Sequence, residues 1–292
     1  MNTVRVLVRR NLKIYFRDRA SVFLSLLSAL ILLLLYLLFL GGLQVDELQS
    51  SLPDATAEDI DWFVGTWVFA GILMITTFTT GFAALGVYVD DKSSGRFKEF
   101  RVSPIRRNEL ILGYQIAAFI VATIMSVVIL VIGGVLMLLI YGHGPSFQQV
   151  LATLGYILLC SWAFSALSSF IMTFVGSNSS YTAVSTIVGT LLGFLAGAYL
   201  PLGLLSKEIG NVLNVLPFSP AAMLMRQPLT TDALDAISGG VPEAATQVSE
   251  YYGIDIFIGD LFVEPLWVIL GLIAMGVVFT GLGAWRIGRT IK

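Results

Sequence analysis

The chain has 292 residues, of which 57% are hydrophobic and 12% are charged, and its mean hydropathy is +0.87. These values exclude a water-soluble domain, because a soluble surface of this size requires far more charge. The formal net charge is −2, and the sequence offers no basic, aromatic-rich soluble face, so we expect no nucleic-acid partner. We predict an all-α integral membrane protein whose single transmembrane domain comprises residues 1–292.

Residues 1–19 are predicted to form an amphipathic helix along the membrane surface. On a helical projection, Val4, Leu7 and Tyr15 fall on one apolar arc. The opposite arc holds five basic residues: Arg5, Arg9, Arg10, Lys13 and Arg17. A cluster that only set membrane orientation would need no such segregation. Because each basic residue near an anionic leaflet contributes about 1 kcal/mol, these five favour binding to membrane lipid.

Four long runs without Asp, Glu, Lys or Arg provide the membrane spans. The third run is long enough for three spans, with turns predicted at "GHGPS" and "GSNSS". The first run is too long for the apolar part of a signal peptide and has no cleavage pattern after it, so we expect it to be retained. Six spans result, at about 21–43, 62–88, 111–141, 147–175, 181–201 and 265–286.

The basic residues predict the orientation of these spans. Fifteen of the 17 Lys and Arg residues lie in 1–20, 89–112 and 286–292, and cytoplasmic segments carry such an excess. We therefore expect both termini and the segment 89–110 to be cytoplasmic, in the cell membrane of a bacterium. Residues 202–264 are then extracellular. Trp62, Trp67, Trp267 and Trp285 lie near predicted span ends, as interfacial anchors do.

The cytoplasmic segment 89–110 carries an unusual pattern. Gly95 ends the preceding helix, Phe97 and Phe100 share one face of a short helix, and Pro104 stops it. Basic residues surround the two phenylalanines: Lys98, Arg101, Arg106 and Arg107. An apolar knob with a charged rim suits a groove on another protein. The alternative is a solvated loop whose basic residues only fix the membrane orientation.

The fourth predicted span has a face of hydroxyl residues. Its members are Ser161, Ser165, Ser168, Ser169 and Thr173. We interpret them as helix-packing residues, because small hydroxyl side chains hydrogen-bond across helices in lipid. The alternative is that they line a transport pathway.

The fifth predicted span has a stripe of small residues: Ser185, Gly189, Gly193 and Gly197. Such a stripe lets another helix approach closely. Two interpretations stay open, namely a dimer interface with a second chain and a contact within the same chain.

Three segments resemble the membrane-spanning permease subunit of ABC transporters of the type-2 exporter class. They are "RRNLKIYFRDRASVF", "DDKSSGRFKEFRVSPIRRNELILGYQ" and "FLAGAYLPLGLLSKEIGNVLNVLPFSPAAMLMRQPL". The resemblance extends over essentially the whole chain. It implies that 1–19 is a connecting helix and that the loop 89–110 contains a coupling helix that docks on a separate ATPase subunit.

The resemblance also implies particular contact residues and breaks. The ATPase contact would comprise Gly95, Phe97, Phe100, Arg101, Pro104 and Arg106. Re-entrant half-helices would lie at 202–216 and 219–228, with breaks at Pro201, Pro217 and Pro220. The segment 229–264 is longer than such permeases need, and the resemblance gives it no role.

The energy source must lie outside this chain. The sequence has no phosphate-binding loop, so we expect no enzymatic activity and no cofactor bound here. ATP and Mg²⁺ would bind to the partner ATPase, and a second permease chain, identical or related, would complete the pathway. No ionisable residue lies in the middle of a predicted span, which argues against an ion-driven carrier, and His143 falls in a predicted turn. The only cysteine, Cys160, supports no metal site.

The expected function is export of an amphiphilic, drug-like, lipid or peptide cargo, because uncharged spans suit such molecules. The alternative is a membrane partner of an ABC ATPase that moves no cargo, such as a sensor or an immunity subunit. The long segment 230–264 is the feature that favours this alternative.

Overall fold

The computed structural model describes residues 2–36, 41–52, 54–97 and 105–290. In these ranges the chain is almost entirely helical and has one two-stranded antiparallel hairpin. The elements in chain order are α1 (Asn2–Arg17), α2 (Arg19–Leu35), α3 (Gly41–Ser51), α4 (Ala57–Ala84), α5 (Gly86–Ser93), α7 (Arg107–Tyr141), α8 (Phe147–Met172), α9 (Asn178–Leu195), η2 (Leu202–Leu204), α10 (Lys207–Val215), α11 (Phe218–Ser238), α12 (Pro242–Tyr251), β1 (Phe257–Ile258), β2 (Leu261–Phe262) and α13 (Pro265–Thr290).

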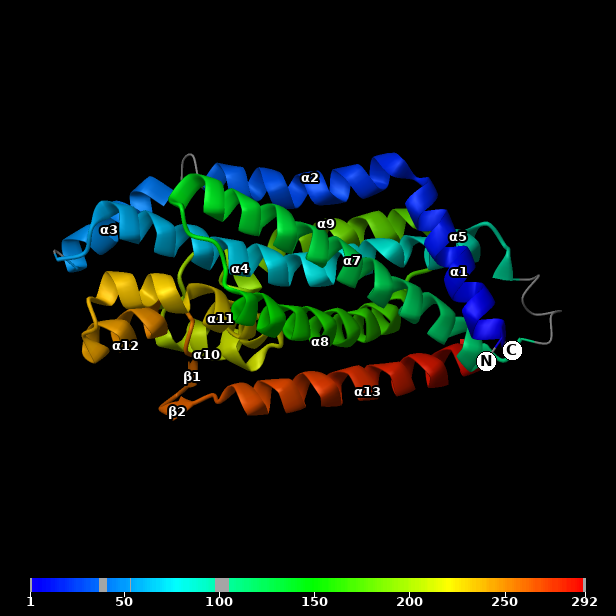
Figure 1. Cartoon of the computed structure of the whole chain (residues 1–292). Helices are drawn as coiled ribbons and strands as arrows, with labels where there is room; N and C mark the ends of the chain where they lie inside the picture. Colours follow the sequence, from blue (N-terminus) through cyan, green and yellow to red (C-terminus); the bar gives the residue numbers. More distant parts are fainter. Residues whose placement is uncertain (1, 37–40, 53, 98–104, 291–292) are drawn as a thin grey trace.

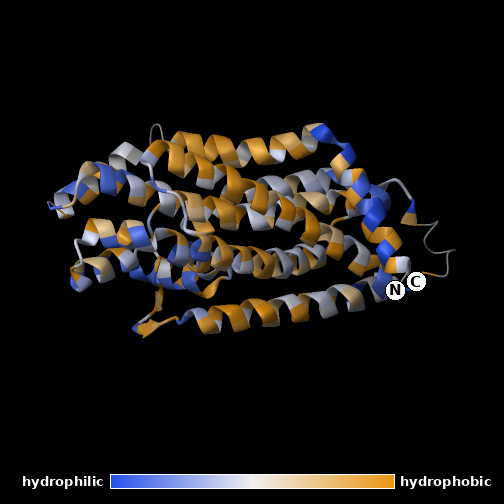
Figure 2. Ribbon diagram, viewed as in Figure 1, coloured by the Kyte–Doolittle hydropathy of each residue, from blue (hydrophilic) through white to orange (hydrophobic). Residues whose placement is uncertain are grey.

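The long helices lie side by side in a bundle with two distinct ends (Figure 1). The terminal end holds α1, α5 and the last turn of α13, so both ends of the chain lie there. The hairpin end holds α3, α10, α12 and the β1–β2 hairpin. Apolar residues cover the middle of the bundle and polar residues gather at its two ends (Figure 2). A bundle that crosses a membrane has this distribution, because lipid tails cannot solvate polar groups.

The first two helices meet at a bend of 75°. α1 lies across the terminal end, whereas α2 runs along the bundle (Figure 1). The buried side of α1 consists of Leu7, Asn11 and Tyr15, which are four residues apart and so share one face. The apolar arc predicted for residues 1–19 therefore packs partly on the bundle.

α4 is the central helix of the bundle, and most of its side chains are buried. It begins after Thr56, whose hydroxyl accepts a hydrogen bond of 3.1 Å from the Asp59 N–H. It packs against α7, α8 and α11. Leu85 separates it from α5, which continues to Ser93. A helix with neighbours on every side can be apolar all round, which explains why the sequence of α4 shows no amphipathic pattern.

Local turn chemistry separates α7 from α8 within the predicted "GHGPS" turn. Gly142 follows α7 with a φ of +73°, a left-handed conformation that suits glycine at a helix end. Ser146 precedes α8, and its hydroxyl accepts a hydrogen bond of 3.3 Å from the Gln149 N–H. The Gln149 side chain accepts in return from the Ser146 N–H at 2.7 Å, which completes a capping box.

The half-helices predicted in the outer segment differ from the structure. Pro201 precedes η2 and Pro217 separates α10 from α11, but Pro220 makes no break. Pro220 lies in the first turn of α11, where a missing N–H leaves no helical hydrogen bond unmade. α11 also continues past Pro228, so the predicted half-helix 219–228 is too short.

The prediction of six spans is not confirmed. By length and composition, four helical segments of the described residues suit a membrane span: 57–93, 108–141, 147–172 and 265–286. The bent pair α1–α2 gives a fifth if both helices are counted as one span. α9 fails the same test because its first half is rich in Ser and Thr, yet it runs alongside the other long helices (Figure 1).

Candidate functional site

The predicted coupling segment begins where α5 ends. Gly95 has a φ of +79°, so the chain leaves the helix in a conformation that other residues rarely adopt. The Phe97 ring packs edge-on against Tyr88, with centroids 5.3 Å apart. Arg106 is exposed immediately before α7. Phe100, Arg101 and Pro104, predicted to contact an ATPase, lie outside the described residues.

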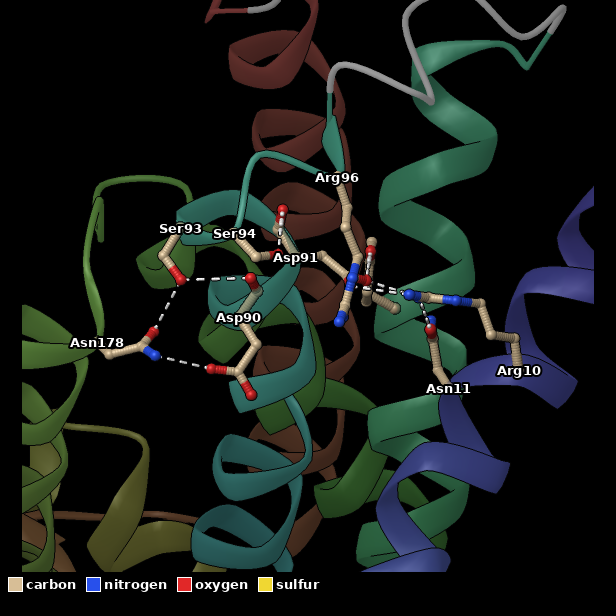
Figure 3. Close-up of polar contacts among 9 residues, drawn as sticks. Arg10, Asn11, Asp90, Asp91, Ser93, Ser94, Arg96 and Asn178 are labelled. Carbon is tan, nitrogen blue, oxygen red and sulfur yellow. Dashed lines mark hydrogen bonds and ion pairs between the residues drawn. The ribbon is translucent and has the colours of Figure 1, made fainter.

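Asp91, near the end of α5, is the centre of a polar network (Figure 3). Its side chain is fully buried and accepts two hydrogen bonds from the Arg10 guanidinium, at 2.6 and 2.8 Å. Arg96 donates a third at 3.0 Å, and the Tyr114 hydroxyl donates a fourth at 2.6 Å. One carboxylate therefore joins α1, α7 and the start of the coupling segment, and its charge is balanced by two cations.

The network also fixes α1 on the side of α7. The Asn11 amide donates to the Gly113 carbonyl at 3.4 Å, and Arg10 donates to the Asn11 side-chain oxygen at 3.0 Å. A Cβ atom on Gly113 would lie 2.7 Å from the Leu7 Cβ, so this close approach requires glycine. Hydrogen bonding to Asp91 raises the pKa of Arg10, which therefore stays charged.

The same part of α5 contacts the connection between α8 and α9. The Asn178 amide donates to the Asp90 carboxylate at 2.9 Å, and the Ser93 hydroxyl donates to the Asn178 oxygen at 3.2 Å (Figure 3). The Lys92 ammonium donates to the carbonyl of Val175 at 2.7 Å and to that of Thr173 at 3.3 Å. Residues 90–96 thus hydrogen-bond to three separate parts of the bundle: α1, α7 and the connection between α8 and α9.

A second polar centre lies toward the hairpin end, at Arg226 on α11. This side chain is fully buried. Its guanidinium donates to the carbonyls of Gly197 at 2.6 Å, Ala196 at 3.2 Å and Gly253 at 3.2 Å. It also lies 5.1 Å from the centre of the Trp67 ring. No carboxylate among the described residues forms an ion pair with it.

Two helix ends stabilise this buried cation. Ala196 and Gly197 follow α9, and Gly253 lies just after α12, so all three carbonyls belong to helix C-termini, which carry partial negative charge. Trp67 supports the arrangement, because its indole N–H donates to the Tyr252 carbonyl at 2.7 Å. The prediction that Trp67 is an interfacial anchor is wrong, since the ring is fully buried.

The hydroxyl residues predicted on the fourth span lie inside the bundle. Ser161, Ser165, Ser168, Ser169 and Thr173 are all buried. Ser165 faces Gly81 on α4, where a Cβ atom would lie 3.1 Å from the serine oxygen. The hydroxyl of Ser169 donates to the carbonyl of Ala166 and that of Thr173 to the carbonyl of Phe170. These residues therefore lie at helix contacts within the chain.

The small residues predicted as one stripe on the fifth span have separate environments. A Cβ atom on Gly193 would overlap the Tyr199 ring, and Gly197 has a φ of +59° in the turn after α9. Nothing approaches Gly189, which is exposed. The last two glycines thus serve the chain reversal toward η2. Gly189 is open to another helix, whereas the Ser185 hydroxyl is buried within the chain.

The basic residues predicted on α1 also divide into two groups. Arg5, Arg9, Lys13 and Arg17 are exposed, whereas Arg10 turns toward Asp91. A helical projection groups all five basic residues on one face, because it contains no information about Asp91, which is distant in the sequence.

The site residues predicted from the sequence do not include Asp91, Tyr114, Asn178 or Arg226, which form the two polar centres. A carboxylate at the end of an apolar run resembles any loop charge. Arg226 does carry a signal, since it is enclosed by apolar residues in "AAMLMRQPL", where a charge is costly unless it is buried with partners.

Comparison with known proteins agrees with the membrane bundle and its polar ends. A family model described as ABC-2 type transporter matches residues 2–229, which include both the Asp91 network and Arg226. No curated protein matches the sequence. Because the family model covers most of the chain, the protein is a membrane-embedded member of the ABC-2 type transporter family.

Proposed function

We propose that this permease is the membrane subunit of an ATP-driven exporter. Its six spans would be α2, α4 with α5, α7, α8, α9 and α13, all of which run between the two ends of the bundle (Figure 1). The terminal end faces the cytoplasm in this proposal. The sequence segments 1–20, 89–112 and 286–292, whose described parts lie at that end, carry 15 of the 17 Lys and Arg residues. The hairpin end is then outside the cell.

A separate ATPase subunit binds ATP and Mg²⁺ and docks on residues 95–106. The observation that carries this proposal is the set of bonds around residues 90–96. This short segment is hydrogen-bonded to α1, to α7 and to the α8–α9 connection. A movement that the ATPase imposes on the adjoining loop would therefore be transmitted to these three parts of the bundle. A loop that only fixed orientation would need none of these contacts.

A second permease chain, identical or related, completes the pathway. Two residues of α9, Leu192 and Gly193, are buried, and nothing lies within 4 Å of a Cβ atom placed on the exposed Gly189, which supports a contact with another chain at that position. The cargo is amphiphilic, drug-like, lipid or peptide, since the membrane-spanning helices place few charged side chains along the transport pathway. A strongly charged polymer would require fixed charges along it.

The docking proposal is tested by replacing both phenylalanines of the loop. Phe97→Ser with Phe100→Ser should leave the permease inserted but detach the ATPase encoded beside it, or abolish ATP-driven efflux from proteoliposomes. Phe147→Ser is the matched control, because Phe147 is 83% exposed at the opposite end of the bundle. If the double variant binds its ATPase and exports cargo as the control does, the docking role is refuted.

One observation favours the alternative function of a sensor or immunity subunit. A cavity of about 500 Å³ opens at the hairpin end between η2, α10 and the hairpin, and Lys207, Glu250 and Asp260 contribute to its lining. A receptor for an external molecule would need such a cavity. Simultaneous measurement of ATPase stimulation and cargo efflux separates the two functions, because a sensor stimulates its ATPase without efflux.

A further inference from the structure

Four basic side chains lie in line along α1, on the face turned away from the bundle. They repeat every four residues, and we name them the α1 basic stripe: Arg5, Arg9, Lys13 and Arg17. All four are exposed, whereas Leu7, Asn11 and Tyr15 on the opposite face are buried. Within the described residues, no carboxylate forms an ion pair with any member of the stripe.

Arg10 lies at the margin of this face and has a different role. Its guanidinium holds the buried carboxylate of Asp91. α1 therefore uses one cation to bind the bundle and presents the other four outward. Four cations on one helix repel one another, and an external anion would relieve this repulsion.

The position of α1, beside the first turns of α7, suits the depth of lipid headgroups. α1 packs on the side of α7 at Gly113, which is about 9 Å along the helix axis from Arg107 at its start. It therefore lies beside the bundle and not beyond its end. α2 follows directly after the bend, and its Phe23 and Leu24 are largely exposed, as side chains that face lipid tails are.

Apolar side chains also interrupt the stripe. Val6 is 66% exposed and Phe16 is 37% exposed, and both project among the basic residues. On a surface facing water this exposure would be unfavourable. At a membrane interface the apolar groups enter the acyl boundary, while the flexible basic side chains reach the phosphates above it.

We propose that the α1 basic stripe binds the phosphates of anionic phospholipids, such as phosphatidylglycerol, in the leaflet that surrounds the terminal end. Four cations that have no ion-pair partner among the described residues complement a layer of phosphates, and the apolar residues between them fit the same boundary. Lipid bound there holds α1 in place, and through Arg10 and Asp91 it also positions the segment that leads into the coupling loop. The content of anionic lipid thus regulates how firmly this segment is held. The proposal does not depend on an ATPase or on export.

The test measures which lipid lies beside α1 in the permease alone. Val6→Cys carries a fluorophore, since this position is exposed inside the stripe, whereas Cys160 is fully buried and does not compete for the label. The protein is reconstituted in phosphatidylcholine with increasing fractions of brominated phosphatidylglycerol, or of brominated phosphatidylcholine, as the quencher. Brominated phosphatidylglycerol should quench the fluorophore at a lower membrane fraction than brominated phosphatidylcholine does. Each neutralised residue should lower this preference up to about fivefold.

Two pairs of substitutions separate charge from structure. Arg9→Gln with Lys13→Gln should remove most of the preference for phosphatidylglycerol, whereas Arg9→Lys with Lys13→Arg should retain it. Should the neutral pair fail to insert, a salt titration of the unaltered stripe gives the answer, because screening should reduce the preference.

Three results would overturn the proposal. They are equal quenching by both lipids, a preference that is independent of salt, and a preference that survives neutralisation. Displacement of phosphatidylglycerol by a soluble acidic peptide or nucleic acid at a low concentration would assign the stripe to that partner instead and would also overturn it.

Discussion

Replacing Asp91 with Asn would test whether one buried carboxylate joins α1, α7 and the coupling segment. Asn keeps the shape of the side chain but removes its charge. One of the two terminal atoms becomes a donor, and it then faces donors from Arg10, Arg96 or Tyr114. Because the side chain is fully buried, water cannot replace the lost acceptor.

The magnitude follows from the bonds that converge on this carboxylate. Four hydrogen bonds of 2.6, 2.8, 3.0 and 2.6 Å end on Asp91. Breaking a buried pair by removing one partner costs about 3–5 kcal/mol. Here the Arg10 and Arg96 side chains are 30% and 53% exposed, so water screens part of the attraction. We expect the free energy of unfolding to fall by about 3 kcal/mol, at the lower end of that range.

Asp90→Asn is the matched control, since it makes the same chemical change one residue away. Asp90 is exposed and accepts a hydrogen bond of 2.9 Å from Asn178. Its replacement should cost less than about 1 kcal/mol. Unfolding in mixed micelles, followed by tryptophan fluorescence, gives both free energies. A double-mutant cycle with Arg10→Gln should yield a coupling energy of about 1–3 kcal/mol.

Two results would refute this reasoning. The first is equal destabilisation by Asp91→Asn and Asp90→Asn. The second is strict additivity of Asp91→Asn and Arg10→Gln, which would mean that the two side chains contribute independently and that the network does not hold α1 on the bundle.

Further predictions concern the hairpin end and the α8–α9 connection. Arg226→Met should lower the free energy of unfolding by about 2–4 kcal/mol, because three buried carbonyls lose a charged donor; unchanged unfolding in mixed micelles would contradict this. Gly193→Ala should lower the melting temperature through overlap with Tyr199, at a cost of about 1–3 kcal/mol, whereas Gly189→Ala should be neutral or stabilising. Equal melting temperatures for the two alanine variants would refute the assignment. Lys92→Met should increase amide hydrogen exchange at the end of α8, because the carbonyls of residues 173 and 175 lose their donor; exchange that stays at the wild-type level would count against this role.

Sequence patterns predicted the parts of the fold that depend on local chemistry. Long apolar runs indicate membrane helices because lipid admits few alternatives. Ser146 and Gly142 mark helix ends through their own hydrogen bonding and backbone conformation, so the turn near residue 142 was predictable. The helical projection of α1 likewise separated the buried Leu7 from the exposed Arg9.

Features that depend on contacts between distant segments were not predictable from one chain. Arg10 and Asp91 are 81 residues apart, and nothing local distinguishes Arg10 from its basic neighbours. Trp67 was placed at a membrane interface because its sequence position is near a span end, but helices from the outer segment cover it. The break predicted at Pro220 was wrong because the effect of proline depends on its place within a helix.

Arg226 has a consequence for how the outer face tolerates acid. Its acceptors are peptide carbonyls, which do not titrate, and an arginine stays protonated in acid. Under the proposed orientation, acidification outside the cell should therefore leave these hydrogen bonds intact. A carboxylate acceptor in the same place would be protonated by acid and would lose its ion pair with the arginine. In the same orientation, the carboxylate-based contact at Asp91 lies on the cytoplasmic side, whereas the Arg226 contact lies on the outer side and has no acceptor that acid can protonate.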